Sequence, residues 1–203
     1  MKVIGLTGPS GAGKSTLCSK FEDLGIPCID TDVIYHKLVS TPSPCLDELR
    51  EKFGDSIINE NGSLNRPALA TLVFTGENAK ENLANLNSTT HKYVWDEVNT
   101  LLTKYINQGK IAAVIDAPAL FSSKIFISAC DIILSVLSDE KSRLSRIMER
   151  DGIDREKALA RISAQPSDEF FIENSDYFII NSGTREEMYE DLMSILEQEG
   201  ICH

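Results

Sequence analysis

Several features are scarce or missing in this sequence, and each absence narrows the class of protein. The five cysteines form no C-x-x-C pair, and their odd number does not suggest a disulfide framework. No apolar run is long enough for a membrane span, since the segments at 111–121 and 125–137 each contain an aspartate. The apolar stretch at the N-terminus stops at Gly8, well short of a secretion signal. We therefore expect a cytoplasmic protein with reduced thiols.

Basic residues are also scarce. Lys and Arg number 20 against 31 Asp and Glu, which gives a formal net charge of −11. Binding to nucleic acid or to an anionic membrane needs clustered Lys and Arg, so we expect neither partner. No run of Pro, Gly or Ser resembles a linker, and no repeat is present. We expect one domain over residues 1–203, as a monomer or weak oligomer.

Apolar strands and helical patterns alternate along the chain. Short apolar runs predict strands at residues 3–7, 26–29, 111–115, 132–137 and 177–180. Helical patterns lie between or after them, at residues 14–24, 141–150, 155–164 and 185–198. This order predicts an α/β fold, a three-layer sandwich around a five-stranded, mostly parallel sheet. Residues 33–108 are mainly helical by pattern, and we interpret them as an insertion that binds the second substrate.

The stretch GPSGAGKS, residues 8–15, lies between the first predicted strand and the first predicted helix. Gly8, Gly13, Lys14 and Ser15 fit the pattern G-x-x-x-x-G-K-[ST] in the context that this motif needs. The glycines let backbone N–H groups turn inward, and the helix N-terminus adds partial positive charge. We expect Lys14 to reach the β- and γ-phosphates of ATP and the Ser15 hydroxyl to bind Mg²⁺. The alternative is a glycine-rich turn with this spacing by chance.

A basic stripe follows the fourth predicted strand. Arg143, Arg146 and Arg150 are spaced i, i+3 and i+7, so they fall within an arc of about 60° on one helix face. We interpret the stripe as part of a helical lid, at about residues 139–165, that closes over ATP, with Arg146 as the main stabiliser of γ-phosphate charge. The alternative is a solvated helix face. The residues expected to bind ATP are Gly8, Ser10, Gly11, Ala12, Gly13, Lys14, Ser15, Thr16, Arg146 and Arg150.

Two aspartates follow predicted strands, at the sheet edge where ligands of parallel sheets bind. Asp32, in the segment Asp30-Thr31-Asp32, is placed to accept or orient the proton of an acceptor hydroxyl. The alternative is that it caps the helix that follows. Asp116 has two interpretations that we leave open, a Mg²⁺ ligand through water or a loop-capping acid.

The phosphate acceptor is indicated by motifs outside the loop. A regulatory GTPase normally carries N-K-x-D and D-x-x-G, and neither string occurs here. Residues 29–39, IDTDVIYHKLV, resemble the I-D-A-D-x-I-A-R-x-L-V segment of dephospho-coenzyme A kinases, and LNSTTH (86–91) resembles their L-N-A-I-T-H. Four more blocks match in register: NGSLNRPALATLVF (61–74), VIDAPALF (114–121), RLSRIMERDGI (143–153) with Arg161 and Gln165, and Asp176 with Asn181-Ser182-Gly183. The resemblance thus spans nearly the whole chain.

The resemblance implies a P-loop kinase that transfers the γ-phosphate of ATP to the ribose 3′-hydroxyl of dephospho-coenzyme A, with Mg²⁺. It implies that Asp32, Lys14 and Arg146 are catalytic, and that Thr7, Asp32 and His91 bind the acceptor. A lone histidine is more often a structural hydrogen-bonding residue, which is the alternative for His91. The other candidate functions are a kinase of another small metabolite or of nucleoside monophosphates, and a non-catalytic nucleotide-binding module.

Four positions depart from the family pattern. His36 stands where arginine is usual, and a neutral imidazole is a poorer partner for anions than a guanidinium. Lys92, Ser122 and Phe171 also differ from the pattern, at positions that we expect to be peripheral to phosphoryl transfer.

Overall fold

A computed structural model describes residues 1–40 and 42–202, and the chain divides into two compact units. The sheet unit comprises Met1–Ile29 and Leu102–His203, and the helical unit comprises Asp30–Leu101. Each unit has its own hydrophobic core. Among the described residues, no helix has the length and apolar character needed to cross a membrane.

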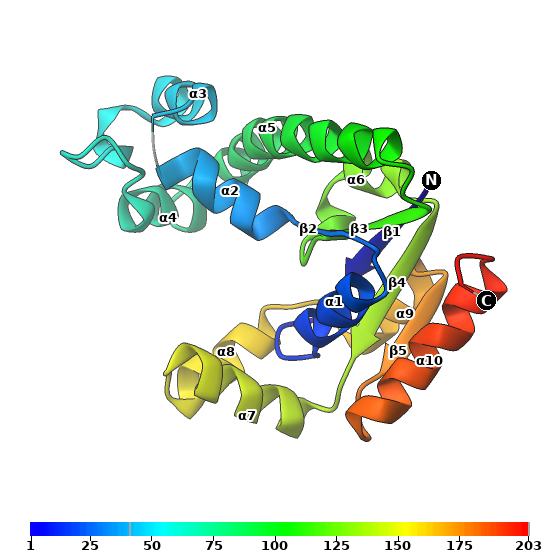
Figure 1. Ribbon diagram of the computed structural model, residues 1–203. Helices are drawn as coiled ribbons and strands as arrows, with labels where there is room; N and C mark the ends of the chain where they lie inside the picture. The colour runs from blue at the N-terminus through cyan, green and yellow to red at the C-terminus, as the bar shows by residue number, and fades with distance from the viewer. Residues whose placement is uncertain (41, 203) are drawn as a thin grey trace. The chain divides into compact units, whose positions relative to one another are not determined.

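The sheet consists of five strands in the order β2-β3-β1-β4-β5 (Figure 1). The strands are β1 (Lys2–Thr7), β2 (Cys28–Asp30), β3 (Ala112–Asp116), β4 (Ile132–Leu137) and β5 (Tyr177–Ile180). β1 lies at the centre and pairs in parallel with both β3 and β4. Every residue of β4 is buried, as expected of a strand that is covered on both faces. The carboxyl ends of β1, β3 and β4 therefore meet at one edge of the sheet, where Leu6 pairs with Asp116 and Thr7 with Ser135.

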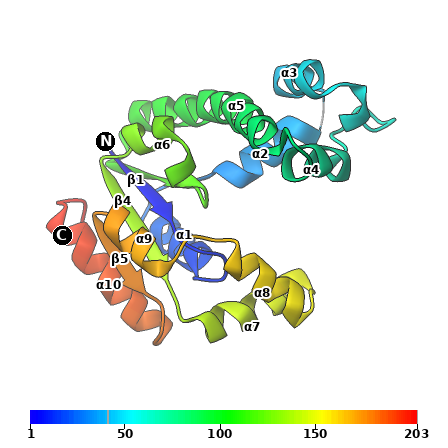
Figure 2. The same ribbon diagram turned by 180° about the vertical axis from the view of Figure 1, so that it is seen from behind.

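Helices cover both faces of this sheet, which makes the three-layer arrangement visible in Figures 1 and 2. One layer contains α1 (Lys14–Asp23) and α10 (Arg185–Gln198), whose buried residues Leu17, Phe21 and Leu192 share a core with the strands. The other layer contains α6 (Lys124–Ala129) and α9 (Asp168–Asn174). The predicted fold class is confirmed.

Two further helices of the sheet unit follow β4, in the segment predicted to be a lid. They are α7 (Glu140–Asp151) and α8 (Arg155–Ser163). Asp139 begins α7, because its carboxylate accepts a hydrogen bond from the N–H of Ser142 at 2.9 Å. Gly152 ends α7 in the left-handed conformation. The two helices pack through Ile147, Ala158 and Ile162.

The helical unit contains α2 (Thr31–Ser40), α3 (Pro44–Phe53), α4 (Arg66–Phe74), most of α5 (Ala79–Asn107) and the 3₁₀ turn η1 (Asp55–Ile57). Its core is apolar and includes Val39, Leu49, Ile57, Leu69 and Val73. Pro44 and Arg66 each begin a helix directly after a capping side chain, Ser43 for α3 and Asn65 for α4. Residue 41 lies outside the described residues.

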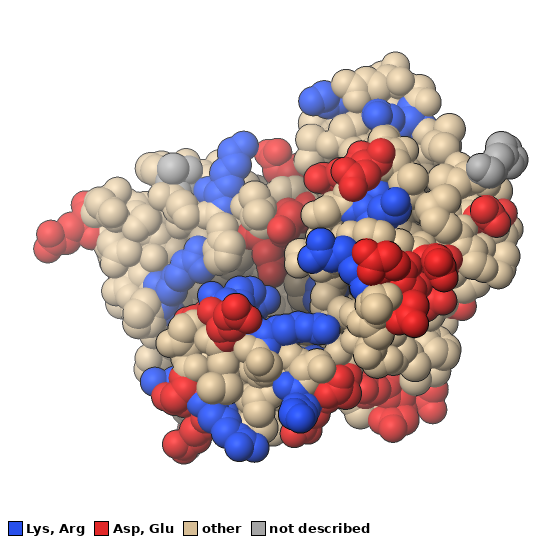
Figure 3. All heavy atoms as spheres, turned by 60° about the horizontal axis from the view of Figure 1, so that its bottom comes forward, with Lys and Arg blue, Asp and Glu red and all other residues tan. Residues whose placement is uncertain are grey.

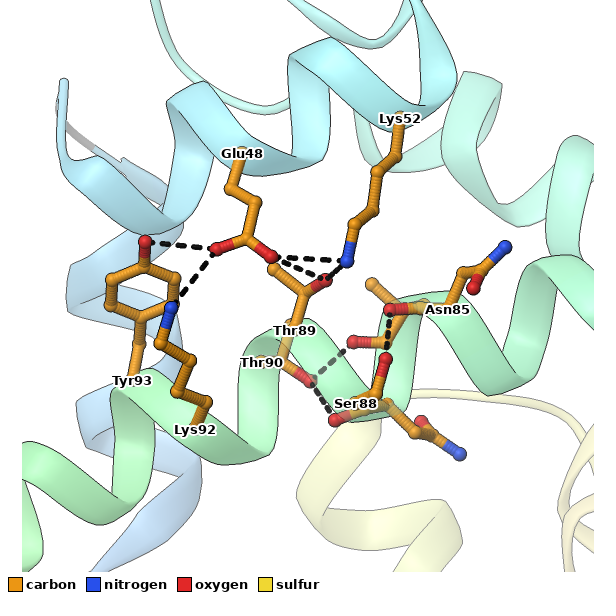
Figure 4. A network of polar contacts seen from close by, with 10 residues as sticks. Glu48, Lys52, Asn85, Ser88, Thr89, Thr90, Lys92 and Tyr93 are labelled. Atoms are coloured by element: carbon orange, nitrogen blue, oxygen red, sulfur yellow. Dashed lines mark hydrogen bonds and ion pairs between the residues drawn. The ribbon is translucent and has the colours of Figure 1, made fainter.

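A polar network joins α3 to α5 within the helical unit (Figure 4). The carboxylate of Glu48 accepts hydrogen bonds from Lys52 and from Tyr93, at 3.0 Å each, and pairs with Lys92 at 3.4 Å. Lys52 also donates to the hydroxyl of the buried Thr89 at 2.6 Å. The hydrogen bonds from Lys52 and Tyr93 hold the pKa of Glu48 at about 2, so it stays ionised.

The details that differ from the pattern in the sequence include one strand boundary and two short helices. The second strand begins at Cys28 rather than Ile26, although the carbonyl of Pro27 already accepts a hydrogen bond from Val114 of β3 at 2.8 Å. The sequence pattern does not predict α6 and α9, because six and seven residues are too few to show a helical period. Neither difference changes the order of strands that carries the site.

Candidate active site

The loop at residues 8–13 joins β1 to α1, and its backbone can be made only with glycine at three positions. Gly8, Gly11 and Gly13 have φ angles of 135°, 77° and 111°, which L side chains rarely adopt. A Cβ atom on Gly8 would lie 2.2 Å from the carbonyl oxygen of Val136 in β4. Helix α1 then begins at Lys14, so the loop ends at a helix N-terminus.

Helix α7 and the residue after β5 also approach this loop too closely for a side chain. A Cβ on Gly11 would lie 2.8 Å from the backbone oxygen of Arg143 in α7. A Cβ on Gly13 would lie 2.2 Å from the side-chain nitrogen of Asn181. Glycine at these positions therefore allows both the turns of the loop and the close contacts of neighbouring residues with it.

Three consecutive carbonyl groups of the loop accept hydrogen bonds from side chains outside it. The bonds are Arg143 Nε to Ser10 O (3.2 Å), Arg146 Nη1 to Gly11 O (3.0 Å) and Asn181 Nδ2 to Ala12 O (2.7 Å). In a planar trans peptide the N–H points opposite to the C=O. The N–H groups of the same peptides, on Gly11, Ala12 and Gly13, therefore point away from these side chains.

Lys14 folds back over the loop, beside the Pro9 carbonyl that accepts the N–H of Ala12. Its Nζ donates to the carbonyl of Gly8 at 2.7 Å and lies 3.5 Å from the carbonyl of Pro9, which also accepts the N–H of Ala12 at 3.2 Å. A lysine ammonium and inward N–H groups at a helix N-terminus are the donor set of an anion site. Ser15 and Thr16, in the first turn of α1, are exposed and half-buried respectively.

The arginine stripe of α7 faces the loop. Arg146 donates to Gly11 O, to Ala12 O at 3.4 Å and to the hydroxyl of Ser138 at 3.2 Å. Arg150 is exposed and donates to the Ser10 hydroxyl at 3.3 Å. The structure thus brings both predicted arginines to the predicted loop.

Arg143, the third member of the stripe, is 6% exposed and packs against the loop. Its Nη2 donates to Oε1 of Gln165 at 3.0 Å, and its Nη1 lies 3.7 Å from the carboxylate of Asp168. The same Gln165 oxygen accepts the N–H of Ser10 at 3.1 Å. Burial lowers the pKa of Arg143 from its ordinary value, although a guanidinium stays charged at neutral pH. The N–H and the C=O of Ser10 are therefore both held by side chains, those of Gln165 and Arg143.

Asp151 joins Arg150 to Arg161 at the other end of α7. Arg150 makes a two-point contact with its carboxylate, at 2.7 and 2.9 Å, and Arg161 of α8 bonds to the same group. These bonds, the one from Arg150 first, hold the pKa of Asp151 at about 2. The pair of arginines is thereby linked across α7 and α8.

Asp116 ends β3 beside the first turns of α1. The thiol of Cys18 donates to its Oδ2 at 3.5 Å, and Ser15 lies one turn earlier on the same helix. The pKa of Cys18 is raised, first by a hydrogen bond with Cys28 and then by burial and by Asp116, so the thiol stays protonated. A hydroxyl and a carboxylate are oxygen ligands of the kind that Mg²⁺ takes together with phosphates, so these residues fit that ion.

Asp32 and His91 lie in the helical unit. Asp30, not Asp32, caps α2, since its carboxylate accepts the N–H of Val33 at 2.9 Å. Asp32 is exposed in the first turn of that helix. His91 is half-buried on α5, and burial lowers its pKa, which favours the neutral imidazole.

Two other predicted or questioned positions have partners of their own. Thr7 is fully buried, and its hydroxyl donates to the carbonyl of Pro118 at 3.4 Å. The Nδ1 atom of His36 is hydrogen-bonded to the guanidinium of Arg66, which can only donate, so this nitrogen is the acceptor. A guanidinium is thus present beside the position where the family pattern has arginine.

The sequence alone missed Ser138, Gln165 and Asn181 as parts of the site. Gln165 and Asn181 fell within matching blocks, but without a role, because the loop that they contact is far away in the chain. Figure 3 turns the lower side of Figure 1, where α7 and α8 lie, toward the reader and shows Lys and Arg side chains gathered there. This local basic surface contrasts with the net charge of −11.

Comparison with known proteins adds a family to this geometry. Residues 2–187 match the dephospho-CoA kinase family. A dephospho-CoA kinase of Bacillus cereus is 38% identical over 199 residues, 98% of either chain. Among solved structures, TT1252 from Thermus thermophilus has a TM-score of 0.78 at 28% identity and 97% coverage of both chains. Dephospho-CoA kinase from Campylobacter jejuni has a TM-score of 0.67 at 22% identity, over 98% of this chain and 97% of that one.

Proposed function

Since the chain belongs to the dephospho-CoA kinase family, we propose that the site described above transfers the γ-phosphate of ATP to the ribose 3′-hydroxyl of dephospho-CoA. The chain is a transferase of coenzyme A biosynthesis that phosphorylates dephospho-CoA with ATP. We assign the ATP site from one observation. The loop carbonyls of Ser10, Gly11 and Ala12 accept hydrogen bonds from side chains outside the loop. A protein needs to do little covalent chemistry in phosphoryl transfer. Its main requirement is hydrogen-bond donors that are positioned around the phosphate oxygens.

On the ATP side, Lys14 and the N–H groups of Gly11 and Gly13 would bind the phosphate oxygens. Lys14 would exchange its bonds to the loop carbonyls for bonds to the β- and γ-phosphates. Ser15, with Asp116 through water, would hold Mg²⁺, which when bound neutralises phosphate charge. Cys18 orients the carboxylate of Asp116 through the bond at 3.5 Å.

We propose that Arg146 stabilises the negative charge on the phosphoryl group during transfer. Its guanidinium donates to the carbonyls of Gly11 and Ala12, and the Ala12 carbonyl belongs to the same peptide as the Gly13 N–H that would meet the phosphates. A planar guanidinium can bond two phosphate oxygens at once. Arg150, held by Asp151 and exposed, would contact the phosphates second.

On the acceptor side, Asp32 would accept or orient the proton of the attacking hydroxyl. Its exposure and the capping bond made by Asp30 leave the Asp32 carboxylate suited to a substrate contact. His91, as a neutral imidazole, would donate or accept a hydrogen bond at the acceptor. Thr7, fully buried, would act there only through the backbone around it.

The test is ADP release from ATP and Mg²⁺ with different acceptors. We expect rapid release with dephospho-CoA, and little with nucleoside monophosphates or without an acceptor. Release with a nucleoside monophosphate alone would instead indicate another P-loop kinase, and nucleotide binding without transfer would indicate a regulatory module. We further propose that the enzyme works in the cytoplasm as a monomer or weak oligomer, with ATP and dephospho-CoA as its partners.

A further inference from the structure

Asn181, the residue directly after β5, is fixed on three sides. Its backbone N–H donates to Leu137 O at 2.7 Å, and its backbone oxygen accepts the Ser138 hydroxyl at 2.8 Å. Its side-chain amide donates to the carbonyl of Ala12 at 2.7 Å. The residue is 9% exposed, so little water competes for this bond. Asn181 is therefore a rigid link between the end of β4 and the phosphate loop.

This link acts on one particular peptide group, that between Ala12 and Gly13. Because the peptide is planar and trans, fixing the Ala12 carbonyl also fixes the direction of the Gly13 N–H. That N–H points away from the Asn181 amide and directly precedes the first turn of α1. Any side chain on Gly13 would collide with the Asn181 amide, as the 2.2 Å approach of a Cβ shows.

Arg146 also donates to the Ala12 carbonyl, at 3.4 Å, but it is assigned a second task. If Arg146 turns to the γ-phosphate, its bonds to the loop are weakened or lost. Asn181 has no such competing task, because its backbone is held by Leu137 and Ser138. The loop then keeps one bond to Ala12 throughout the reaction.

We propose that Asn181 is a positioning residue for nucleotide binding, which aims the Gly13 N–H at a phosphate oxygen through its bond to the Ala12 carbonyl. The inference rests on the proposed ATP site but not on the identity of the acceptor. Asparagine suits the task because its amide donates a hydrogen bond without a charge. Aspartate, of the same size, would set a carboxylate against a carbonyl oxygen and remove the donor.

The test is the affinity for ADP in the presence of Mg²⁺, measured by calorimetry. We expect Asn181→Asp to weaken binding at least about tenfold, the usual effect of losing a hydrogen bond in such a network. Asn174→Asp is the matched control, since Asn174 of α9 also donates to a backbone carbonyl, at 2.8 Å, in the same unit. It should bind ADP within about twofold of the wild type. Equal ADP affinity of the two variants would overturn the proposal.

A second variant and a spectroscopic measurement keep the proposal testable if Asn181→Asp does not fold. Asn181→Ala removes the donor without adding charge, and it should also bind ADP more weakly, at a temperature well below the melting temperature measured for the variant. In the wild type, the Gly13 amide proton should move downfield when ADP is added, as a hydrogen bond to phosphate requires. A Gly13 amide that ADP leaves unmoved would contradict the inference. Neither result depends on dephospho-CoA, so a failure of the proposed acceptor would be seen separately.

Discussion

Oδ1 of Asp30 accepts a hydrogen bond from the backbone N–H of Val33 at 2.9 Å, which makes Asp30 the capping residue of α2. Asp32, two residues further on, lies in the first turn of the same helix. Mutation can therefore separate the capping role of Asp30 from the catalytic role that we propose for Asp32.

The first prediction concerns Asp32→Asn, which keeps the size of the side chain and removes its charge and basicity. We expect turnover to fall about 10²–10⁴-fold, or about 3–5 kcal/mol of barrier, because general-base catalysis is lost. ADP affinity should stay close to that of the wild type. Steady-state kinetics with dephospho-CoA and calorimetry with ADP measure the two quantities.

Asp30→Asn is the control for that variant. Asparagine caps a helix about as well as aspartate, so both stability and turnover should remain near the wild type. If Asp30→Asn abolishes transfer while Asp32→Asn retains it, the catalytic assignment belongs to Asp30. If both variants are fully active, the acceptor is activated without either carboxylate.

The second prediction is that Lys14→Ala removes most of the activity and leaves the fold intact. The Lys14 ammonium bonds to loop carbonyls of Gly8 and Pro9, and its removal opens no core cavity. Lys20→Ala is the control on the same helix, where Lys20 lies 5.1 Å from the ring centre of Tyr189. That variant should lose at most about 1 kcal/mol of stability and keep its turnover. Full turnover of a folded Lys14→Ala protein would contradict the assignment.

The third prediction is that Arg146→Lys is not a conservative change. A lysine has no planar fork, so it cannot bond Gly11 O and the Ser138 hydroxyl, or two phosphate oxygens, in the same way. We expect a large fall in kcat with the KM for dephospho-CoA nearly unchanged. An effect confined to KM for dephospho-CoA would mean that Arg146 belongs to the acceptor site.

The fourth prediction compares two glycines with nearly equal backbone angles, Gly11 with φ 77° and Gly109 with φ 71°. Alanine at Gly109 meets no atom within 4 Å, so it should cost only the left-handed strain of about 1–2 kcal/mol. Alanine at Gly11 would also press against the backbone of Arg143, and we expect a larger loss of stability together with loss of ADP binding. Urea unfolding measures the stability of each variant, and calorimetry measures its affinity for ADP. Equal losses of stability would show that the backbone of α7 can move away from the new side chain with no loss of stability.

The fifth prediction concerns how the stability of the folded chain depends on acid pH. The pKa of Glu48 is about 2 in the folded chain against an ordinary value of 4.5, mainly because of Lys52 and Tyr93. A depressed folded pKa means that the unfolded state takes up the proton first, so this stabilisation is present above about pH 4.5 and is lost as the pH falls toward 2. Urea unfolding at several pH values should show a flatter slope in this window for Glu48→Gln.

Glu51→Gln, at an exposed position on the same helix, is the control and should leave that slope nearly unchanged. Part of the slope will remain in Glu48→Gln, since Asp151 also has a pKa of about 2. An unaltered slope in Glu48→Gln would mean that the polar network between α3 and α5 does not distinguish the folded from the unfolded state.

The sequence could predict those parts of the site whose residues lie close together in the chain. GPSGAGKS contains the turns, the lysine and the helix start in eight consecutive residues, and the spacing of Arg146 and Arg150 follows from one helix period. The bonds that hold the loop could not be predicted in this way. Asn181 is 169 residues from Ala12, and Gln165 is 155 residues from Ser10. Only the parallel order of strands brings their backbones together.

The burial of each side chain is the other property of the site that could not be predicted from the sequence. The helix period placed Arg143 on the same face as Arg146 and Arg150, which is correct, but it gave all three the same environment. The structure buries Arg143 against Gln165 and leaves Arg150 exposed. The burial of each side chain on this helix face depends on how the helix packs against the loop. A local sequence pattern does not predict that packing.

The bonds to Ser10, Gly11 and Ala12 are made entirely within the chain. The conformational entropy of the phosphate loop is therefore given up during folding and does not have to be given up again for each molecule of ATP. Because a preformed site avoids a slow ordering step, association with nucleotide should proceed at a rate set by diffusion and charge. A chain with a net charge of −11 repels ATP at long range, so this rate should rise as salt is added.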